Sequence, residues 1–168
     1  PNAFSRLIEA WRVPTLGGIG VTIVLLLGYG FVAFYLGTRQ QFFQVTPVAG
    51  SRSQRLRLAL KTLLVPALLS ELVWRVLLIP HPTEGVDTPV WWAWTGISVL
   101  LNVLWYPLLA IVCRRPRSST FLHPMFLLLT GLLGLVCAGI YSQTGSLWTI
   151  VPIHWSVVMI WQLRLGGM

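Results

Sequence analysis

Residues 118–163 read SSTFLHPMFLLLTGLLGLVCAGIYSQTGSLWTIVPIHWSVVMIWQL, a stretch that contains no Asp, Glu, Lys or Arg. A helix that crosses a lipid bilayer needs about 20 mostly apolar residues, so this stretch is long enough for two such helices. The polar segment 142–146 (SQTGS) lies between its two apolar parts and predicts a turn there. We therefore expect membrane-spanning helices near residues 121–141 and 147–165.

The rest of the chain contains three further apolar runs, near residues 16–36, 60–79 and 90–113. Of the 168 residues, 55% are hydrophobic and only 10% are charged, whereas a soluble domain is about one-quarter charged. The composition excludes a water-soluble globular domain and predicts an all-α protein, a polytopic transmembrane helix bundle of about five spans. We expect residues 15–168 to form a single transmembrane domain, and residues 1–14 to lie at the membrane interface before it.

Basic residues outnumber acidic ones by 12 to 4, which gives a net charge of +8. They are clustered between alternate apolar runs, a pattern that sets membrane orientation rather than one that binds nucleic acid. The connectors after the second and fourth runs lack Lys and Arg. We therefore expect the first and third connectors and the C-terminus to be cytoplasmic. Those two connectors contain Arg39, Arg52, Arg55, Arg57 and Lys61, and Arg114, Arg115 and Arg117.

Two charged residues, Glu71 and Arg75, interrupt the second apolar run. They are four residues apart, with the acid nearer the N-terminus, which is the favourable order for an ion pair on a helix. Charges inside a membrane helix are costly and usually have a partner and a function. The pair either stabilises the bundle by mutual neutralisation or belongs to a functional site, and we favour the site.

His123 and His154 are the polar candidates in the last two spans. At about 1.5 Å per residue, Glu71 and His154 lie at similar depth, and His123 lies one or two turns nearer the cytoplasmic surface. One carboxylate and two imidazoles that meet in a bundle can bind and deprotonate water, the central step of peptide hydrolysis by general base catalysis. The same histidines can equally hold a metal ion or ligate a chlorophyll, or form hydrogen bonds that only support packing.

At these residues the sequence resembles a known family. Residues 70–75 (SELVWR) and 76–80 (VLLIP) resemble the E-E-x-x-x-R motif of the CAAX-protease and bacteriocin-processing (CPBP, or Abi) family of intramembrane glutamic proteases. Residues 141–148 (YSQTGSLW), followed by His154, are similar to the stretch before the last conserved histidine of that family. The end of the chain, from HWSVV at 154–158 to LGG at 165–167, is most similar to cyanobacterial and plastid versions. The resemblance covers residues 60–167.

The resemblance implies an intramembrane endopeptidase in which a glutamate and histidines activate water to cut a peptide bond at the membrane. Glu71 would be the base and Arg75 its orienting partner, while His123 and His154 would position water and stabilise the tetrahedral intermediate. The substrate would be a membrane protein or a peptide, with no certain cofactor, in a bacterial plasma membrane or a thylakoid.

Three positions depart from the family's pattern. Ser70 stands where the motif has its first glutamate, Val158 where it has an asparagine, and Ser119 where it has a phenylalanine. These departures leave an alternative open, a catalytically inactive member of the family. Such a member would act as a membrane scaffold, an assembly factor or an accessory subunit of a larger membrane complex, for example a photosynthetic one.

Overall fold

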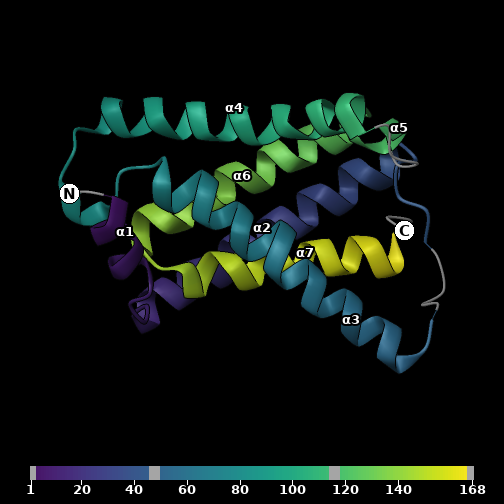
Figure 1. The fold of residues 1–168 in the computed structure, drawn as a ribbon, viewed down its shortest axis with the longest axis horizontal. Helices are drawn as coiled ribbons and strands as arrows, with labels where there is room; N and C mark the ends of the chain where they lie inside the picture. The colour runs from purple at the N-terminus through teal and green to yellow at the C-terminus, as the bar shows by residue number, and fades with distance from the viewer. Residues whose placement is uncertain (1–2, 46–49, 114–117, 166–168) are drawn as a thin grey trace.

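The computed structural model describes residues 3–45, 50–113 and 118–165, and every regular element in these ranges is helical. The four long α-helices are α2 (Leu16–Arg39), α4 (Thr88–Cys113), α6 (Pro124–Thr144) and α7 (Leu147–Arg164). Helix α6 packs against α2, α4 and α7, so it joins the other long helices into one bundle (Figure 1). The predicted all-α helix bundle is confirmed.

The path of the second predicted span is not a regular α-helix. It consists of α3 (Arg52–Thr62) and two wider, π-helical segments, η1 (Leu63–Leu69) and η2 (Leu72–Leu77). Pro66 lies inside η1 and has no N–H to donate to the preceding turn. Side chains of neighbouring helices satisfy carbonyl groups along this path. The Ser98 hydroxyl on α4 donates to the Trp74 carbonyl, and Trp155 Nε1 on α7 donates to the Ala59 carbonyl at 3.0 Å.

Capping residues move two helix boundaries away from the predicted ones. Helix α3 begins at residue 52 rather than near 60, because Ser51 and Gln54 form a reciprocal capping box. Helix α6 runs over 124–144 rather than 121–141, because His123 caps its N-terminus. At its other end, the hydroxyl groups of Ser142 and Thr144 donate to carbonyls of their own helix. These polar residues therefore extend α6 instead of ending it.

Among the residues that the structure describes, four helical segments are long and apolar enough to cross a membrane: α2, the path from Arg52 to Glu84, α4 and α6. Helix α7 forms where the fifth span is predicted, but it is not among them. It packs against η1, α2 and α6. Helices that contact protein on several sides need fewer apolar side chains than helices that face lipid. The crossing of the membrane by α7 stays a prediction.

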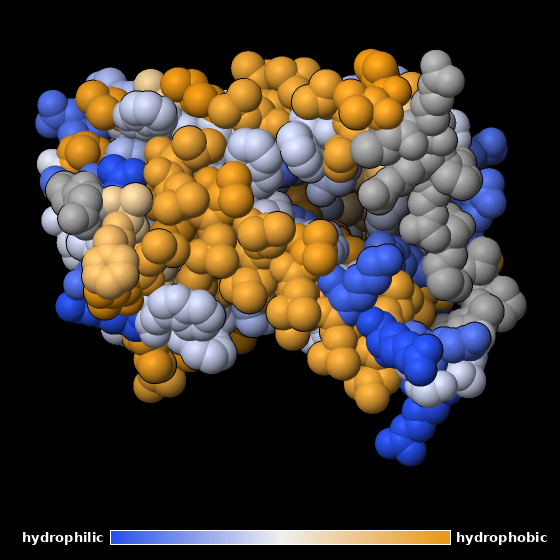
Figure 2. All heavy atoms as spheres, viewed as in Figure 1, coloured by the Kyte–Doolittle hydropathy of each residue, from blue (hydrophilic) through white to orange (hydrophobic). Residues whose placement is uncertain are grey.

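The surface distribution of side chains fits a protein embedded in a bilayer. Large apolar residues are exposed along α2 and α4, and Figure 2 shows apolar side chains across the middle of the molecule, with hydrophilic ones gathered toward its ends. This protein is an integral membrane protein. The basic residues Arg52, Arg55, Arg57 and Lys61 are exposed on α3, whereas Arg114, Arg115 and Arg117 lie outside the described residues.

The N-terminal segment is held against the bundle. Helix α1 (Ala3–Ala10) packs against η2, and Arg6 forms an ion pair with Glu84 of the short 3-10 helix η3 (Pro82–Glu84), with Nε 2.6 Å from Oε1. Ser146 donates to the carbonyl of Arg12 at 2.6 Å, and Trp148 to that of Trp11 at 3.1 Å. Residues 3–12 of the predicted interfacial segment thus contact three separate parts of the fold.

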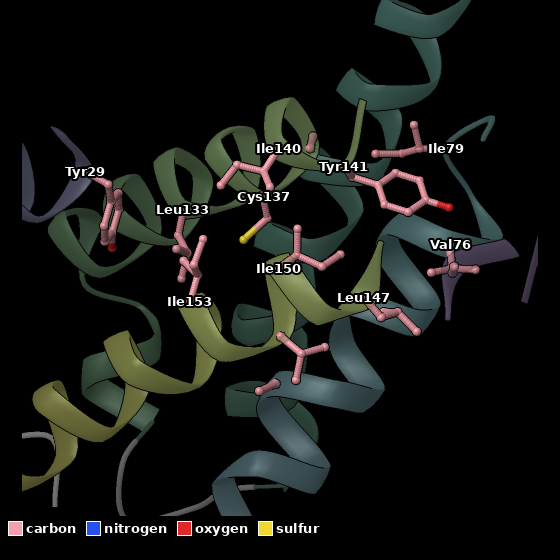
Figure 3. Packing of buried hydrophobic residues seen from close by; sticks show 14 of the residues in the cluster. Tyr29, Val76, Ile79, Leu133, Cys137, Ile140, Tyr141, Leu147, Ile150 and Ile153 are labelled. Carbon is pink, nitrogen blue, oxygen red and sulfur yellow. The ribbon is translucent and has the colours of Figure 1, made fainter. Parts of the chain in front are cut away.

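The core lies between α6, α7 and the π-helical path. Figure 3 shows Leu133 and Cys137 of α6 next to Ile150 and Ile153 of α7. Cys137 and Ile150 have no exposed surface. This packing fixes α7 relative to α6 and to η1, and so positions the polar residues described next.

Candidate active site

Glu71 lies between the two π-helical segments, and Arg75 lies inside the second one, η2. Their side chains are 0% and 1% exposed, and Arg75 Nε is 3.2 Å from Glu71 Oε2. The structure therefore contains the ion pair that the four-residue spacing predicts. Removing two charges from water is costly, and their mutual attraction offsets this only when the geometry is good. The hydroxyl of Ser70, the residue before Glu71, is buried and has no hydrogen-bond partner within the described part of the chain.

His154 of α7 binds the other oxygen of the same carboxylate. Its Nδ1 atom is 2.5 Å from Glu71 Oε1, and the His154 side chain is 5% exposed. Both carboxylate oxygens thus face a nitrogen, one from His154 and one from Arg75. A carboxylate that binds Nδ1 fixes the orientation of the imidazole ring and leaves Nε2 free to accept a proton, as in the Ser-His-Asp triad.

Gly134 of α6 makes room for the guanidinium group. A Cβ atom at this position would lie 2.9 Å from Arg75 Nη2, which is closer than real Cβ contacts allow. An alanine at position 134 would therefore require the Arg75 guanidinium to shift.

A cavity of about 330 Å³ lies beside this cluster. Arg75 and His154 line it together with Asn102, and most of its other lining residues are apolar or aromatic. Glu71 is absent from the described residues that line it, so the carboxylate lies behind the imidazole and the guanidinium. A peptide in this cavity would meet His154 and Arg75 first.

His123 does not join the cluster. It precedes α6, and its Nδ1 accepts a hydrogen bond from the backbone N–H of Met125 at 3.2 Å. The side chain is exposed, and its ring centroid is 4.9 Å from that of Phe42. The structure thus brings together Glu71 and His154, but not the third group that the depth estimate expects beside them.

His123 instead lines a second cavity of about 370 Å³. Phe42, Trp161 and Leu165 line both cavities. The two cavities therefore adjoin, and we call the one beside the Glu71–His154 cluster the inner cavity. Besides His123, the second cavity is lined by Ser119 and Thr120 of α5 (Ser118–Phe121).

Sequence reasoning missed a polar stripe on α4. Thr95, Ser98 and Asn102 recur at spacings of three and four residues in an otherwise apolar run, and they are 1%, 0% and 2% exposed. This spacing puts them on one face of a helix. Polar residues with helical spacing inside a predicted span are a signal that could have identified this face as the one that packs inward.

The described residues contain no group of three or more His, Cys, Asp or Glu side chains that could hold a metal ion. His123 and His154 belong to different surroundings, the first at a helix N-terminus and the second against Glu71. The arrangement that could bind a metal or a pigment through both histidines is not formed.

A protein-family model, Type II CAAX prenyl endopeptidase Rce1-like, matches residues 52–160, which is more than half of the chain. The chain belongs to this family. No curated protein and no solved structure matches the chain significantly. The matched residues include Glu71, Arg75, His123 and His154.

The three residues that depart from the family's pattern lie at different places in the structure. Val158 lines the inner cavity and Ser119 the adjoining one. Ser70 lies next to Glu71 on the π-helical path. Ser70 and Val158 therefore lie near Glu71 and His154, whereas Ser119 lines the cavity that contains His123.

Proposed function

We propose that this protein is an intramembrane endopeptidase of the CAAX-protease type, in which His154 activates the attacking water. One observation carries this proposal: His154, bound through Nδ1 to Glu71 at 2.5 Å, lines a cavity large enough for a peptide segment. The resemblance makes Glu71 the base. The geometry favours a different role, in which Glu71 orients His154 and stabilises its protonated form.

The proposed reaction begins with a water molecule hydrogen bonded to His154 Nε2. The imidazole takes a proton from the water as the oxygen attacks the peptide carbonyl carbon, and the carbonyl electron pair moves onto its oxygen. Glu71 stabilises the imidazolium that forms, and Arg75 interacts with the developing negative charge. When the C–N bond breaks, His154 Nε2 returns the proton to the leaving amine.

The substrate that we infer is a membrane protein or a membrane-bound peptide, because the cavity lies inside a helix bundle that spans the bilayer. His123 lines the adjoining cavity, where it would contact the chain entering the site. We further infer that the basic connectors and the C-terminus face the cytoplasm. The enclosing membrane would be a bacterial plasma membrane or a thylakoid.

Ser70, Val158 and the enclosed carboxylate favour a second candidate function. In this alternative the Glu71–Arg75–His154 cluster only stabilises the bundle, and the protein is a scaffold, assembly factor or accessory subunit of a larger membrane complex. Such a subunit would be recovered with its complex in mild detergent, whereas a separate protease would not.

Cleavage of membrane-protein substrates by the purified protein tests the proposal. We expect His154→Gln to lower kcat by about 10²- to 10⁴-fold, the usual contribution of a general base. His81→Gln is the matched control, because His81 is also buried and hydrogen bonded but lies outside the cavity.

Two further variants separate the candidate functions. Glu71→Ala should abolish cleavage if the protein is an enzyme. An inert parent protein together with an active Ser70→Glu variant would instead support the inactive scaffold.

A further inference from the structure

Arg6 of α1 connects the N-terminal segment to the end of η2. Its guanidinium group donates from Nη1 to the Leu77 carbonyl at 3.1 Å and from Nη2 to Glu84 Oε2 at 2.8 Å. Nε lies 2.6 Å from the other oxygen of the Glu84 carboxylate, and the Arg6 and Glu84 side chains are 19% and 6% exposed. The planar guanidinium group presents its donors in a fixed fork. Arg6 therefore joins η2 to η3 in one defined geometry.

The Leu77 carbonyl is at the C-terminal end of η2, two residues after Arg75. The last carbonyl groups of a helix have no partner within the helix. A donor from another element therefore helps to fix this end of η2, and α1, which also packs against η2, supplies it. Because Arg75 belongs to η2, α1 holds the segment that carries one partner of Glu71.

The same N-terminal segment contacts the beginning of α7. Ser146, the N-cap residue of α7, donates to the Arg12 carbonyl at 2.6 Å, and Trp148 Nε1 donates to the Trp11 carbonyl at 3.1 Å. The rings of Trp11 and Trp148 are also in edge contact, with centroids 5.7 Å apart. His154 follows on α7 about two turns further along.

Residues 3–12 thus bridge η2 and α7, and we call them the N-terminal clamp. Ala10 of the clamp has no exposed surface and belongs to the hydrophobic core. The contact between Glu71 and His154 joins the same two elements, because Glu71 is the N-cap residue of η2 and His154 belongs to α7. A misplacement of a catalytic group by about 1 Å can lower a rate about 100-fold.

We propose that Arg6 is a positioning residue of the endopeptidase, which acts through η2 and α7 to keep His154 against Glu71. This proposal rests on the proposed endopeptidase function. Of the described residues that line the two cavities, none belongs to α1. Arg6 therefore acts on the orientation of the Glu71–His154 pair and not on the bound substrate.

Steady-state cleavage by the purified full-length protein tests the assignment. The variant Arg6→Met/Glu84→Gln removes the connection without leaving a buried carboxylate unpaired. Its amide oxygen can still accept the His81 backbone N–H that Glu84 Oε1 accepts at 2.9 Å. We expect kcat to fall at least about tenfold and KM to change less than about threefold, because orientation at the reacting centre is lost while the cavities are unchanged.

Glu9→Gln is the matched control within α1. Glu9 pairs with Arg12 inside the clamp, and the Arg12 side chain is largely exposed. This variant should leave kcat and KM as in the parent. An equal loss of kcat in Glu9→Gln would overturn the specific role of Arg6.

The His154→Gln background separates positioning from a general loss of folded protein. If Arg6 acts through His154, adding Arg6→Met/Glu84→Gln to His154→Gln should lower kcat by less than about threefold more, because residues that act as a unit are not additive. The full tenfold loss in that background would mean that the clamp only stabilises the fold, and it would overturn the assignment.

The imidazole ¹⁵N chemical shifts of His154, assigned with His154→Gln, report the contact with Glu71 independently of cleavage. They should change in Arg6→Met/Glu84→Gln and not in Glu9→Gln. An unchanged His154 signal, or an unchanged kcat, overturns the positioning role and leaves the proposed endopeptidase intact. A parent protein that cleaves no substrate overturns the endopeptidase proposal and the catalytic consequence of Arg6 with it, whereas a changed His154 signal would still show that the clamp positions the pair.

Discussion

The Glu71 carboxylate binds a guanidinium nitrogen through one oxygen and an imidazole nitrogen through the other, with no exposed surface. Sequence reasoning could predict the pairing with Arg75, because residues four apart on a helix are neighbours. Depth counting also brought His154 near Glu71. The depth estimate wrongly placed His123 beside Glu71 and His154. Residues at similar depth on different helices need not face the same cavity.

At the residue scale, we predict that Glu71→Gln destabilises the protein by about 3–5 kcal/mol, because Arg75 would keep a buried charge without a counterion. The double variant Glu71→Gln/Arg75→Met, which removes both charges, should be less destabilised than Glu71→Gln alone. Unfolding in mixed detergent micelles gives both free energies.

The exposed pair of Glu9 and Arg12 supplies the control for this experiment. Glu9→Gln should cost no more than about 1 kcal/mol, since solvent screens exposed ion pairs. Equal losses in Glu9→Gln and Glu71→Gln would contradict the buried-pair interpretation.

We also predict that Gly134→Ala lowers kcat at least tenfold and costs about 1–3 kcal/mol of stability, because the added methyl group displaces the Arg75 guanidinium. Gly139→Ala on the same helix is the matched control, since a Cβ there meets no atom within 4 Å. It should leave kcat unchanged. If Gly134→Ala behaves like Gly139→Ala, the close packing of Arg75 against α6 is not required.

At the scale of elements, the existence of the helices was predictable and their local form was not. The apolar runs are long enough to identify α2, α4 and α6, whereas nothing in the pattern of residues 60–79 distinguishes π-helical from α-helical turns. The π-helical turns depend on partners from other helices, such as the bond from Ser98 to the Trp74 carbonyl. Caps shift boundaries for a similarly local reason, as His123 does for α6.

The turn between α6 and α7 gives a prediction at this scale. Gly145 ends α6 with φ +60°, and a Cβ there would lie 2.5 Å from His81 Nε2. We expect Gly145→Ala to destabilise the protein by more than the cost of a left-handed residue alone, about 1–2 kcal/mol.

Gly85→Ala measures that conformational cost separately. Gly85 also has φ +60°, but a Cβ at this position meets no atom within 4 Å. The difference between the two melting temperatures therefore reports the contact with His81. Equal shifts in the two variants would mean that His81 moves away freely.

For the whole molecule, hydropathy and charge were sufficient to identify an integral membrane protein. They predicted about five spans, and among the described residues four helical segments have the length and composition to cross. The crossing by α7 stays a prediction. Helix α7 is not among these four, and it packs against η1, α2 and α6. The packing partners of α7 are decided by the tertiary fold, so a hydropathy pattern alone could not reveal them.

The orientation predicted from the basic connectors can be checked by cysteine labelling in intact cells. Ser53, in the first turn of α3, and Val86, between η3 and α4, are both exposed. A membrane-impermeant maleimide should label Val86→Cys in intact cells and Ser53→Cys only after lysis, because basic connectors stay on the cytoplasmic side. The parent protein gives the background from its own cysteines. The opposite labelling pattern would contradict the predicted orientation and show that the basic connectors face outward.

The contacts of α1 have a consequence for biosynthesis. Residues 3–12 are made before the four long helices, but their partners include Glu84, Ser146 and Trp148. Since chains grow from the N-terminus at about 5–20 residues per second, this segment must wait until Trp148 has been synthesised. Its docking therefore follows the synthesis of α2, α4 and α6, and it joins residues 3–12 to the hairpin of α6 and α7.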